Sequence, residues 1–399
     1  MVPSIHYADD LPSRAELVVI GGGVVGAATA FFARRAGLAP LLIERCPALC
    51  TLTTPASTGA FRLQFDNPEE LEMVRESVDL FLNFADSTGQ DDYDLSVRQQ
   101  GYLWVTTDER RAERQRDLVE KQHGWGQTDI EVLTGEDVRE RWPWISPEVR
   151  QARWRPGDGF LDPKALTMGF AAGARADVRV DCEATGFKIR GGRLVGVETS
   201  RGVVDCDAAV IACGPFSGLV AATAGIELPI ETLQRQKIIM PDVPLVPPDA
   251  PMTIDDDTGA HWRPALRGAY LLFTDPGTLP SPPAENVPPD HRHAFRLLAP
   301  DSPTSVARVA PFWREVWDRN EVIWLIHAGQ YTMTPDHRPL LGHTAIEGLF
   351  LNTGYSGHGI MGSPAGSRHM VDVMVGKIDP SENTFAPDRT FEPRDLDVL

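Results

Sequence analysis

Residues 16–27 of the chain read ELVVIGGGVVGA, and this stretch decides the fold. An apolar run over residues 17–20, after Glu16, leads directly into glycines at positions 21, 23 and 26. A helical pattern then covers residues 27–37, and a second apolar run over residues 38–43 ends at Glu44. The order of strand, tight glycine turn, helix, strand and acid predicts a dinucleotide-binding unit in a doubly wound α/β domain.

Each glycine of this turn has a physical role. Gly21 permits the sharp turn after the strand, Gly23 lets a pyrophosphate approach the backbone, and Gly26 lets the helix pack closely on the strand. The N–H groups of the first helical turn and the helix dipole favour anionic phosphates. Glu44 can accept hydrogen bonds from both ribose hydroxyls and disfavours a 2′-phosphate, so we expect FAD or NAD rather than NADP.

The composition limits the possible partners. The chain has 399 residues, 42% hydrophobic and 24% charged, which is enough for two domains. The net charge of −18 argues against nucleic acid and anionic membranes as partners. No apolar run approaches a membrane span, and residues 1–14 lack the features of a signal peptide. Five cysteines without a paired or zinc-binding spacing indicate a reduced, cytoplasmic protein, and the histidine spacing predicts no metal site.

Helix and strand patterns alternate along the rest of the chain. Asn67 caps a helix expected to reach about residue 86, and its predicted buried face consists of Leu71, Val74, Val78, Phe81 and Leu82. Further helices are expected at residues 108–123, 134–141 and 163–176, and strands at 101–105, 178–180, 184–199 (a hairpin), 208–215, 228–240, 261–264, 268–273, 324–331 and 348–354. Proline-rich residues 241–251 and 278–289 predict surface loops. Residues 355–362 form a second glycine-rich helix start, with further free N–H groups for an anion.

Four segments, in this order, resemble the FAD-dependent D-amino-acid oxidase superfamily. They are residues 21–44, VIACGPFS at 210–217, TPDHRPLLG at 334–342 and NTGYSGHG at 352–359, and the most similar branch is that of the glycine and sarcosine oxidases. The resemblance implies a doubly wound, Rossmann-like FAD-binding domain plus a mixed-sheet α+β substrate domain. We assign residues 1–90, 155–225 and 335–399 to the first domain, and residues 91–154 and 226–334 to the second.

The resemblance also implies a reaction and a set of cofactor contacts. A hydride passes from Cα of an amine to flavin N5, water hydrolyses the resulting imine, and O₂ commonly reoxidises the flavin to give peroxide. Backbone N–H groups of residues 357–360 suit the stabilisation of negative charge at the flavin N1–C2=O edge. The residues expected to hold FAD are Gly21, Gly23, Val24, Val25, Gly26, Glu44, Arg45, Thr58, Gly59, Ala60, Arg62, Cys213, Gly214, Gly354, Gly357, His358, Gly359, Ile360 and Met361.

The substrate side matches the sarcosine oxidase pattern only in part. Tyr331 matches an active-site tyrosine, His261 lies where that branch has a second pocket tyrosine, and Arg62 matches an arginine beside the flavin. The cysteine that carries covalent flavin would fall at Gly329, so noncovalent FAD is expected. The two cations that bind the substrate carboxylate are replaced by Met361 and Phe65, and no lysine stands between Lys237 and Lys377 to serve as the oxygen-activating one.

These departures change the expected substrate. A substrate carboxylate would need another cation, and the candidates are Arg263, Arg267 and Arg338. The residues that we expect in the catalytic site are Tyr331, His261, Arg62 and Arg263. Residues 65, 270, 273 and 361 suggest a more apolar pocket. We therefore expect an N-substituted glycine or another secondary amine with a larger apolar arm, giving glyoxylate or an aldehyde, an amine and H₂O₂.

Other interpretations start from the same glycine motif. A dehydrogenase would use another electron acceptor than O₂, and a flavin-binding subunit would belong to a larger dehydrogenase. A flavin hydroxylase would need a Gly-Asp pair near the end of the chain, where Asn352, Thr353 and Gly354 stand instead. The oligomeric state stays open.

Overall fold

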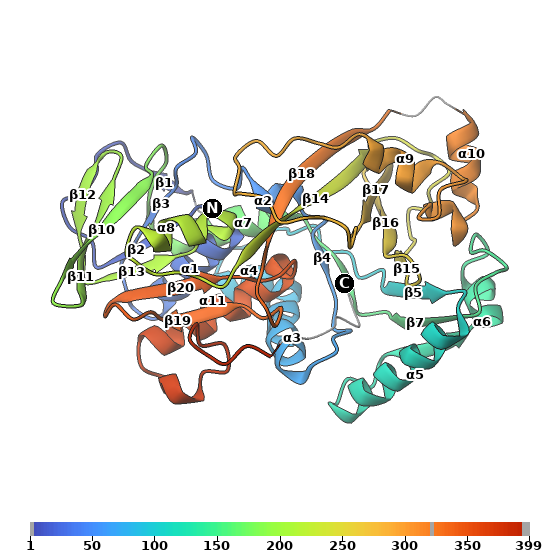
Figure 1. Ribbon diagram of the computed structural model, residues 1–399, viewed down its shortest axis with the longest axis horizontal. Coiled ribbons are helices and arrows are strands. Elements are labelled where there is room, and N and C mark those ends of the chain that lie inside the picture. The colour runs from blue at the N-terminus through green and yellow to red at the C-terminus, as the bar shows by residue number, and fades with distance from the viewer. Residues whose placement is uncertain (1–3, 320–322, 393–399) are drawn as a thin grey trace.

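The computed structural model describes residues 4–319 and 323–392 and contains two large sheets (Figure 1). The first three residues of the N-terminal stretch and the last seven of segment 335–399 lie outside the described residues. No helix in the described part of the chain is long and apolar enough to cross a membrane. The cytoplasmic location stays a prediction.

The first sheet has seven strands in the order β1-β9-β3-β2-β13-β20-β19. All neighbours pair in parallel except the antiparallel edge pair β20 and β19, and the strands are β1 (His6–Tyr7), β9 (Asp177–Arg179), β3 (Pro40–Ile43), β2 (Leu17–Ile20), β13 (Ala208–Ile211), β20 (Leu349–Thr353) and β19 (Leu340–His343). Strands far apart in sequence are neighbours here, because β13 pairs with both β2 and β20. This order of parallel strands is that of a doubly wound domain.

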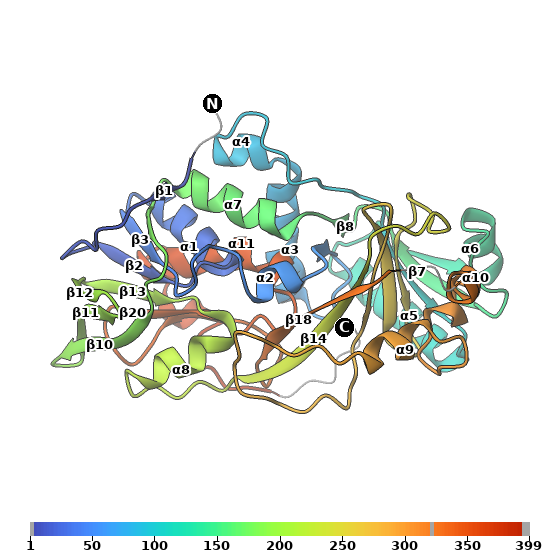
Figure 2. The same cartoon turned by 90° about the horizontal axis from the view of Figure 1, so that it is seen from above.

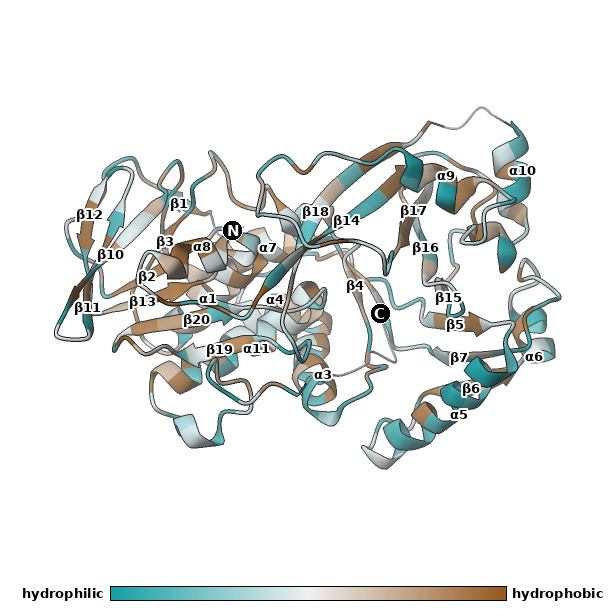
Figure 3. Cartoon of the chain, viewed as in Figure 1, coloured by the Kyte–Doolittle hydropathy of each residue, from teal (hydrophilic) through white to brown (hydrophobic). Residues whose placement is uncertain are grey.

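Both faces of this sheet are covered, which explains why its strands β2, β3 and β13 are apolar throughout. Leu17 and Val19 face one core with helices α1 (Val24–Arg35), α3 (Pro68–Leu82), α7 (Pro163–Ala174) and α11 (Gly359–Met374). Val18 and Ile20 face a second core with α8 (Ser217–Ala222) and with a three-stranded sheet of β10 (Ala184–Arg190), β11 (Arg193–Thr199) and β12 (Gly202–Asp205). Strand β20 of this sheet is largely hydrophobic in Figure 3.

The second sheet has eight strands in the order β18-β14-β17-β16-β15-β5-β7-β6. Only β15 and β5 pair in parallel, and the strands are β18 (Leu325–Met333), β14 (Glu231–Met240), β17 (Gly268–Phe273), β16 (Ala260–Ala265), β15 (Met252–Asp255), β5 (Tyr102–Thr106), β7 (Gln151–Arg155) and β6 (Glu131–Thr134). Figure 2 shows β14 and β18 extending from this sheet toward the seven-stranded half. The fold class expected from the sequence is thereby confirmed.

The two faces of this mixed sheet differ. One face packs on α9 (Arg292–Leu298) and α10 (Phe312–Arg319) through Trp262, Leu271 and Trp313, and beside α6 (Gly135–Arg141) through Leu103. At the β5–β7 end, the opposite face packs Tyr102 and Trp104 against Leu118 of α5 (Glu109–Gly124), whose outer surface is hydrophilic in Figure 3. The strands of each sheet come from one of the two predicted domains, although β7 extends to Arg155. The division into domains itself stays a prediction.

Short elements complete the chain, and several were not expected. They are α2 (Thr53–Ala56), β4 (Ala60–Phe61), α4 (Phe84–Thr88), β8 (Gly159–Phe160) and the 3-10 turns Gly214–Phe216, Val306–Arg308 and Pro380–Glu382. The helix expected to reach residue 86 ends at Leu82, where the backbone of Asn83 leaves the helical region before α4 begins. Leu82 was wrongly placed on the buried face, because its side chain is 45% exposed.

Candidate active site

A cavity of about 440 Å³ extends from the carboxyl ends of β2, β3 and β13 to β18 and the N-terminus of α11. Ligands of doubly wound sheets bind at this edge, where the strand order reverses. Of the residues expected to hold FAD, those that line it are Gly21, Gly23, Val24, Val25, Glu44, Arg45, Cys213, Gly214, Gly354, Gly357, Gly359 and Ile360. The sequence pattern thus brings together two glycine-rich segments more than 300 residues apart.

The first glycine turn has the geometry that a pyrophosphate requires. Gly21 has φ +116°, a conformation that favours glycine, and a Cβ on Gly26 would overlap the Gly21 carbonyl oxygen. Gly23 is the N-cap residue of α1. Because it has no side chain to accept hydrogen bonds from the first helical turn, amide groups of that turn are left facing the cavity. Gly26 therefore acts through close packing behind the turn and does not itself line the cavity.

Glu44 lies at the end of β3 and is nearly buried. Its Oε2 accepts a hydrogen bond from the Gly22 N–H at 2.5 Å, and its Oε1 accepts one from the Cys46 N–H at 2.8 Å. The carboxylate is thus held in one orientation at the cavity wall, with acceptor capacity left for ribose hydroxyls.

Further residues line the same end of the cavity and were not among those named to hold FAD. They are Thr51 to Thr54 and Ser57 from the hydroxyl-rich loop of residues 51–59, whose place close to a nucleotide suggests hydrogen bonds to it, Cys182 to Thr185 after β9, and Phe216, Leu219, Val220 and Thr223 around α8. Thr54 accepts a hydrogen bond from the Val24 N–H at 3.2 Å. Little in the sequence indicated these residues, because the segments around β9, β10 and α8 are distant from β3 in the chain and come together with it only in the folded protein.

The other end of the cavity lies where β18 meets α11. Gln330, Tyr331 and Thr332 line it together with residues 354, 355, 357, 359 and 360. Gly357 has φ +94°, and a Cβ there would lie 2.7 Å from Cε2 of Tyr331, so the turn and the ring fit closely. Burial raises the pKa of Tyr331, which keeps its phenol protonated at neutral pH.

Arg62, His358 and Glu70 form a buried chain beside this end. The Arg62 guanidinium lies 3.4 Å from Nε2 of His358, and Nδ1 of His358 lies 3.1 Å from Oε1 of Glu70. Burial by itself would raise the pKa of Glu70, but the hydrogen bond and charge of His358 hold it below its ordinary value. Met361 lies with its sulfur 3.9 Å from Nη1 of Arg62, and the Phe65 ring packs edge-on against His358. These side chains lie next to the cavity, not among its lining residues.

His261 and Arg263 lie on β16, on the face of the mixed sheet that carries Trp104 and Tyr331. The register fixes this, because Trp104 pairs with Ile254, Ile254 with His261, and His261 with Leu272 of the next strand. Nδ1 of His261 donates to the Gly259 carbonyl at 2.8 Å, and burial lowers its pKa to about 4, so the imidazole is neutral.

Arg263 is engaged by the backbone. Its Nε and Nη2 both donate to the Thr58 carbonyl, and its Nη1 donates to the Pro264 carbonyl. Burial lowers its pKa to about 10. This arginine therefore fixes the loop that holds Thr58, Gly59 and Ala60, none of which lines the cavity.

The other two carboxylate-binding candidates lie elsewhere. Arg267 is exposed in the turn between β16 and β17 and pairs with Asp242. Arg338 pairs with Glu69 at 3.0 Å.

The sequence analysis missed three buried or half-buried cations on the second sheet. Lys237 on β14 donates to the carbonyls of Pro55 and Ser57, and burial lowers its pKa to about 7. Arg235, also on β14, lies 5.6 Å from the Tyr331 ring, and Arg153 on β7 lies over Trp104. No sequence signal marked them, since only the strand register shows which face they occupy.

Taken together, a doubly wound sheet, two glycine-rich helix starts on one cavity and an acid at the end of β3 define a dinucleotide-dependent enzyme of the flavoprotein class. The family model described as FAD dependent oxidoreductase (DAO) matches residues 16–373, and the chain belongs to that family. FAD is therefore the cofactor, and the residues fit it: the first glycine turn and Glu44 suit the ADP half, and the Gly357 turn with α11 suits the ring half.

Individual relatives place the chain near the sarcosine and glycine oxidases. FAD-dependent oxidoreductase domain-containing protein 1 of Xenopus laevis is 26% identical over 94% of this chain and 81% of its own length. Sarcosine oxidase subunit beta of an Arthrobacter species is 25% identical over 91% of this chain and 87% of its own. The crystal structure of L-proline dehydrogenase from P. horikoshii has a TM-score of 0.81 at 26% identity, covering 94% of this chain and 98% of that one.

Two further matches set limits. Glycine oxidase from Bacillus cereus, at 24% identity and a TM-score of 0.77, shares the fold over 92% of this chain and 96% of its own. The chain spans only 44% of the length of 4-methylaminobutanoate oxidase (formaldehyde-forming) from Paenarthrobacter nicotinovorans. The resemblance that the four sequence segments indicated is confirmed, as is an oxidoreductase that acts on amino acids or amines.

Proposed function

We propose that the protein oxidises the C–N bond of a secondary amino acid, with noncovalently bound FAD. The observation that carries the proposal is that the cavity ends at Tyr331 and Gly357, where the mixed sheet meets the N-terminus of α11. When bound, FAD supplies the acceptor for a hydride from the amine carbon. The names of three relatives support a secondary amine, because sarcosine, proline and 4-methylaminobutanoate all have an N–H between two carbons.

The residues have separable roles in this proposal. Since the Gly259 carbonyl can only accept, Nδ1 of neutral His261 carries the proton and Nε2 is left as an acceptor for a substrate proton. Tyr331 keeps its phenolic proton and can donate a hydrogen bond. The Arg62 cation and the amide groups at the start of α11 favour negative charge at the end of the cavity where β18 meets α11. Arg263 positions the loop of residues 58–60.

The substrate is one with an apolar arm, either an N-substituted glycine or another secondary amino acid. Phe65 and Met361 support this, since both are buried beside Arg62 where the sarcosine oxidases have cations. The products are then glyoxylate or an aldehyde, an amine and, with O₂ as acceptor, H₂O₂. We propose first that O₂ reoxidises the reduced flavin. The second possibility is transfer of the electrons to another acceptor, as in a dehydrogenase or a flavin-binding subunit of a larger dehydrogenase.

Anaerobic mixing of the holoenzyme with secondary amino acids tests the proposal. We expect N-methylated amino acids to bleach the flavin absorbance, and readmission of air to restore it with stoichiometric H₂O₂. Bleaching without recovery in air but with recovery by an artificial acceptor would favour the dehydrogenase. Bleaching only by NAD(P)H would favour a hydroxylase, and no bleaching by any amine would refute the proposal.

A further inference from the structure

Glu70 is an ionised acid in the interior of the molecule. It lies in the first turn of α3 and is 5% exposed. Burial by itself would raise its pKa, but the hydrogen bonds of His358 and Asn67 hold that pKa below its ordinary value. Both carboxylate oxygens are engaged, because Oε1 lies 3.1 Å from Nδ1 of His358 and Oε2 accepts from Nδ2 of Asn67 at 2.8 Å. An apolar side chain of the same size would be less costly to bury, so the acid indicates a role other than packing.

His358 connects Glu70 to the turn that lines the cavity. It is the N-cap residue of α11, and its neighbours Gly357, Gly359 and Ile360 line the cavity, whereas His358 itself does not. The imidazole therefore lies behind the turn, on the side of α3. Since an ionised carboxylate can only accept, Nδ1 of His358 carries the proton that it shares with Glu70. The Glu70 carboxylate thus holds the residue that directly precedes the first peptide groups of α11.

The turn before α11 needs such a contact, because glycines stand on both sides of His358. Gly357 has φ +94°, and Gly359 begins the helix, so neither neighbour has a side chain that could fix the turn. The Ser356 N–H donates to the Thr332 carbonyl at 2.8 Å and ties the start of the turn to β18. Beyond that point the imidazole of His358, held by α3, fixes the direction of the following peptide groups.

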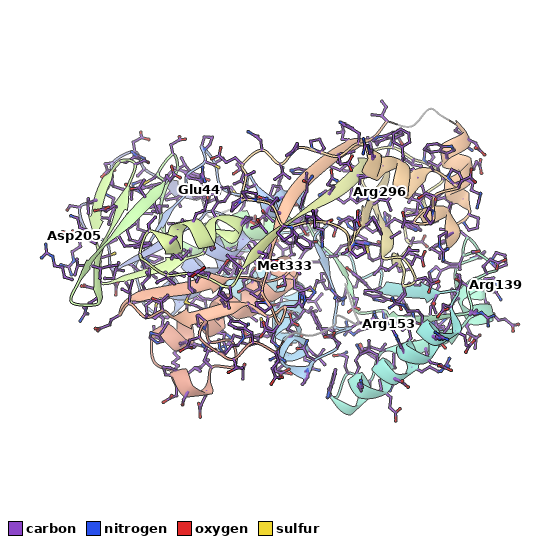
Figure 4. The ribbon with its side chains drawn as sticks, viewed as in Figure 1. Glu44, Arg139, Arg153, Asp205, Arg296 and Met333 are labelled. Carbon is purple, nitrogen blue, oxygen red and sulfur yellow. The ribbon has the colours of Figure 1, made fainter. Side chains whose placement is uncertain are left out.

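These peptide groups face the end of the cavity where β18 meets α11. Residues 359 and 360 line the cavity, and the N–H groups of a first helical turn have no partner within their own helix. Figure 4 shows the end of β18, marked by Met333, well apart from Glu44 at the other end of the cavity. The N-terminus of α11 therefore lies at the proposed place of the flavin ring, where it favours the negative charge that reduction puts on the ring.

A second acid on α3 provides a comparison. Glu76 also pairs with α11, through Nε and Nη2 of Arg368, but it does so further along both helices and with both side chains partly exposed. The Ser77 hydroxyl accepts from the Ala365 N–H at 3.1 Å in the same region. Helix α3 thus holds α11 at several points, and Glu70 holds it at the turn that lines the cavity.

We propose that Glu70 is a positioning residue for the flavin reaction. Through His358 it holds the first turn of α11 so that the amide groups of this turn stabilise negative charge on the reduced flavin. The proposal rests on the proposed function only for the place of the flavin ring. The charge of Glu70 by itself would oppose reduction of the flavin, so a role through position and a role through charge predict different effects of the two variants below.

The test is the midpoint potential of the bound FAD, measured by titrating the holoenzyme with dithionite in the presence of reference dyes. Glu70→Asp keeps the charge but is one methylene too short to reach Nδ1 of His358. We expect its equilibrium constant for reduction to fall about tenfold, which makes the potential about 30 mV more negative. Glu70→Gln keeps the reach and loses the charge, so its potential should equal that of the wild type or be more positive. The control Glu76→Gln should leave the potential unchanged.

A second variant covers the case in which Glu70→Asp does not fold. His358→Gln places its amide near the position of Nε2 and loses the contact with Glu70, so its potential should also become more negative. An unchanged or more positive potential in Glu70→Asp or in His358→Gln would overturn the inference. Because dithionite reduces the flavin without an amine, the two proposals are separable. If no amine bleaches the flavin but Glu70→Asp lowers the potential, the proposed function fails and the role of Glu70 stands.

Discussion

Burial sets the charge of the residues that surround the candidate site. His261 is neutral because desolvation lowers its pKa to about 4, Tyr331 keeps its proton because desolvation raises its pKa, and Arg153 stays a cation because its pKa falls only to about 10. The surroundings of the site therefore combine neutral hydrogen-bonding groups, His261 and Tyr331, with buried cations such as Arg62 and Arg153.

The pH dependence of stability tests the state of His261. An exposed imidazole has a pKa of about 6.5, so between that pH and about 4 the unfolded chain binds a proton that the folded chain does not. The free energy of unfolding therefore falls as the pH falls through this window. His261→Gln should remove about 1.4 kcal/mol per pH unit from that slope, measured by urea unfolding at several pH values. The exposed His291→Gln serves as control, and an unaltered slope in His261→Gln would contradict neutral burial.

Gly23 tests the cofactor assignment at a single position. A Cβ there would meet only Oγ1 of Thr54 at 3.2 Å, so the folded chain can accommodate a side chain, but a valine would occupy the space of the pyrophosphate. We expect Gly23→Val to fold and to be purified without flavin, as measured by absorbance and circular dichroism. Stoichiometric FAD in the purified variant would count against this turn as the pyrophosphate site.

At the scale of elements, a proline-rich segment of residues 280–290 connects β14 and β18 with Arg45 at the cavity wall. Three glutamine side chains on β14 and β18 hold this segment by hydrogen bonds to its backbone. Gln330 donates to the Pro282 carbonyl and accepts from the Ala284 N–H, Gln234 donates to the Pro288 carbonyl, and Gln236 accepts from the Asp290 N–H. From this segment Glu285 forms an ion pair with Arg45, which follows Glu44 at the cavity wall and stacks over Phe216. The mixed sheet thus contributes to the ADP end of the cavity as well as to its ring end.

The ion pair of Glu285 with Arg45 should affect how well FAD is retained. Glu285→Gln removes the attraction without shortening the side chain, so we expect FAD to dissociate several times faster from the variant, with little change in thermal stability. Because both side chains are partly exposed, high salt should speed release from the wild type and not from the variant. Flavin fluorescence after dilution measures the rate. The control is Glu347→Gln, because the ion pair of Glu347 with Arg193 lies at the three-stranded sheet. Equal rates of FAD release in the wild type and both variants would refute a role of Glu285 in retaining FAD.

At the scale of the whole molecule, the loop of residues 53–61 is one place where the mixed sheet contacts the half that contains the seven-stranded sheet. Lys237 and Arg263 of the mixed sheet bond the carbonyls of Pro55, Ser57 and Thr58. The Gly329 backbone packs against α2, where a Cβ on Gly329 would lie 2.9 Å from Cβ of Ala56. The loop that follows Glu44 therefore ties the mixed sheet to the half that contains the seven-stranded sheet.

Noncovalent attachment of FAD is expected from this arrangement and can be tested directly. Gly329 has no nucleophilic side chain, and the cysteines that line the cavity, Cys50, Cys182 and Cys213, follow β3, β9 and β13. Precipitation of the holoenzyme with trichloroacetic acid should release all flavin into the supernatant. Yellow colour or in-gel fluorescence in the washed pellet would show a covalent bond.

Local sequence patterns predicted the elements that depend on nearby residues. Asn67 caps α3 through a hydrogen bond from the Glu70 N–H, and Thr134 caps α6 in a capping box, both as their spacing indicates. Strands β6, β7, β12 and β19 were missed, since their residues are mixed in polarity and become strands only by pairing with neighbours. In the candidate site, the glycine turn and the Gly357 loop were found from sequence, whereas Arg153, Arg235 and Lys237 were not.

The sequence by itself determined the dinucleotide-binding unit, the family and the second glycine-rich helix start, because these depend on glycines and on a carboxylate whose roles are set by local backbone geometry. Only the tertiary structure decided which cations surround the candidate substrate site. Arg267 and Arg338 look equal to Arg153 in sequence, yet the first lies in an exposed turn and the second pairs with Glu69. The register of a mixed sheet chooses which side chains share a face, and burial then sets the protonation state of the groups on that face.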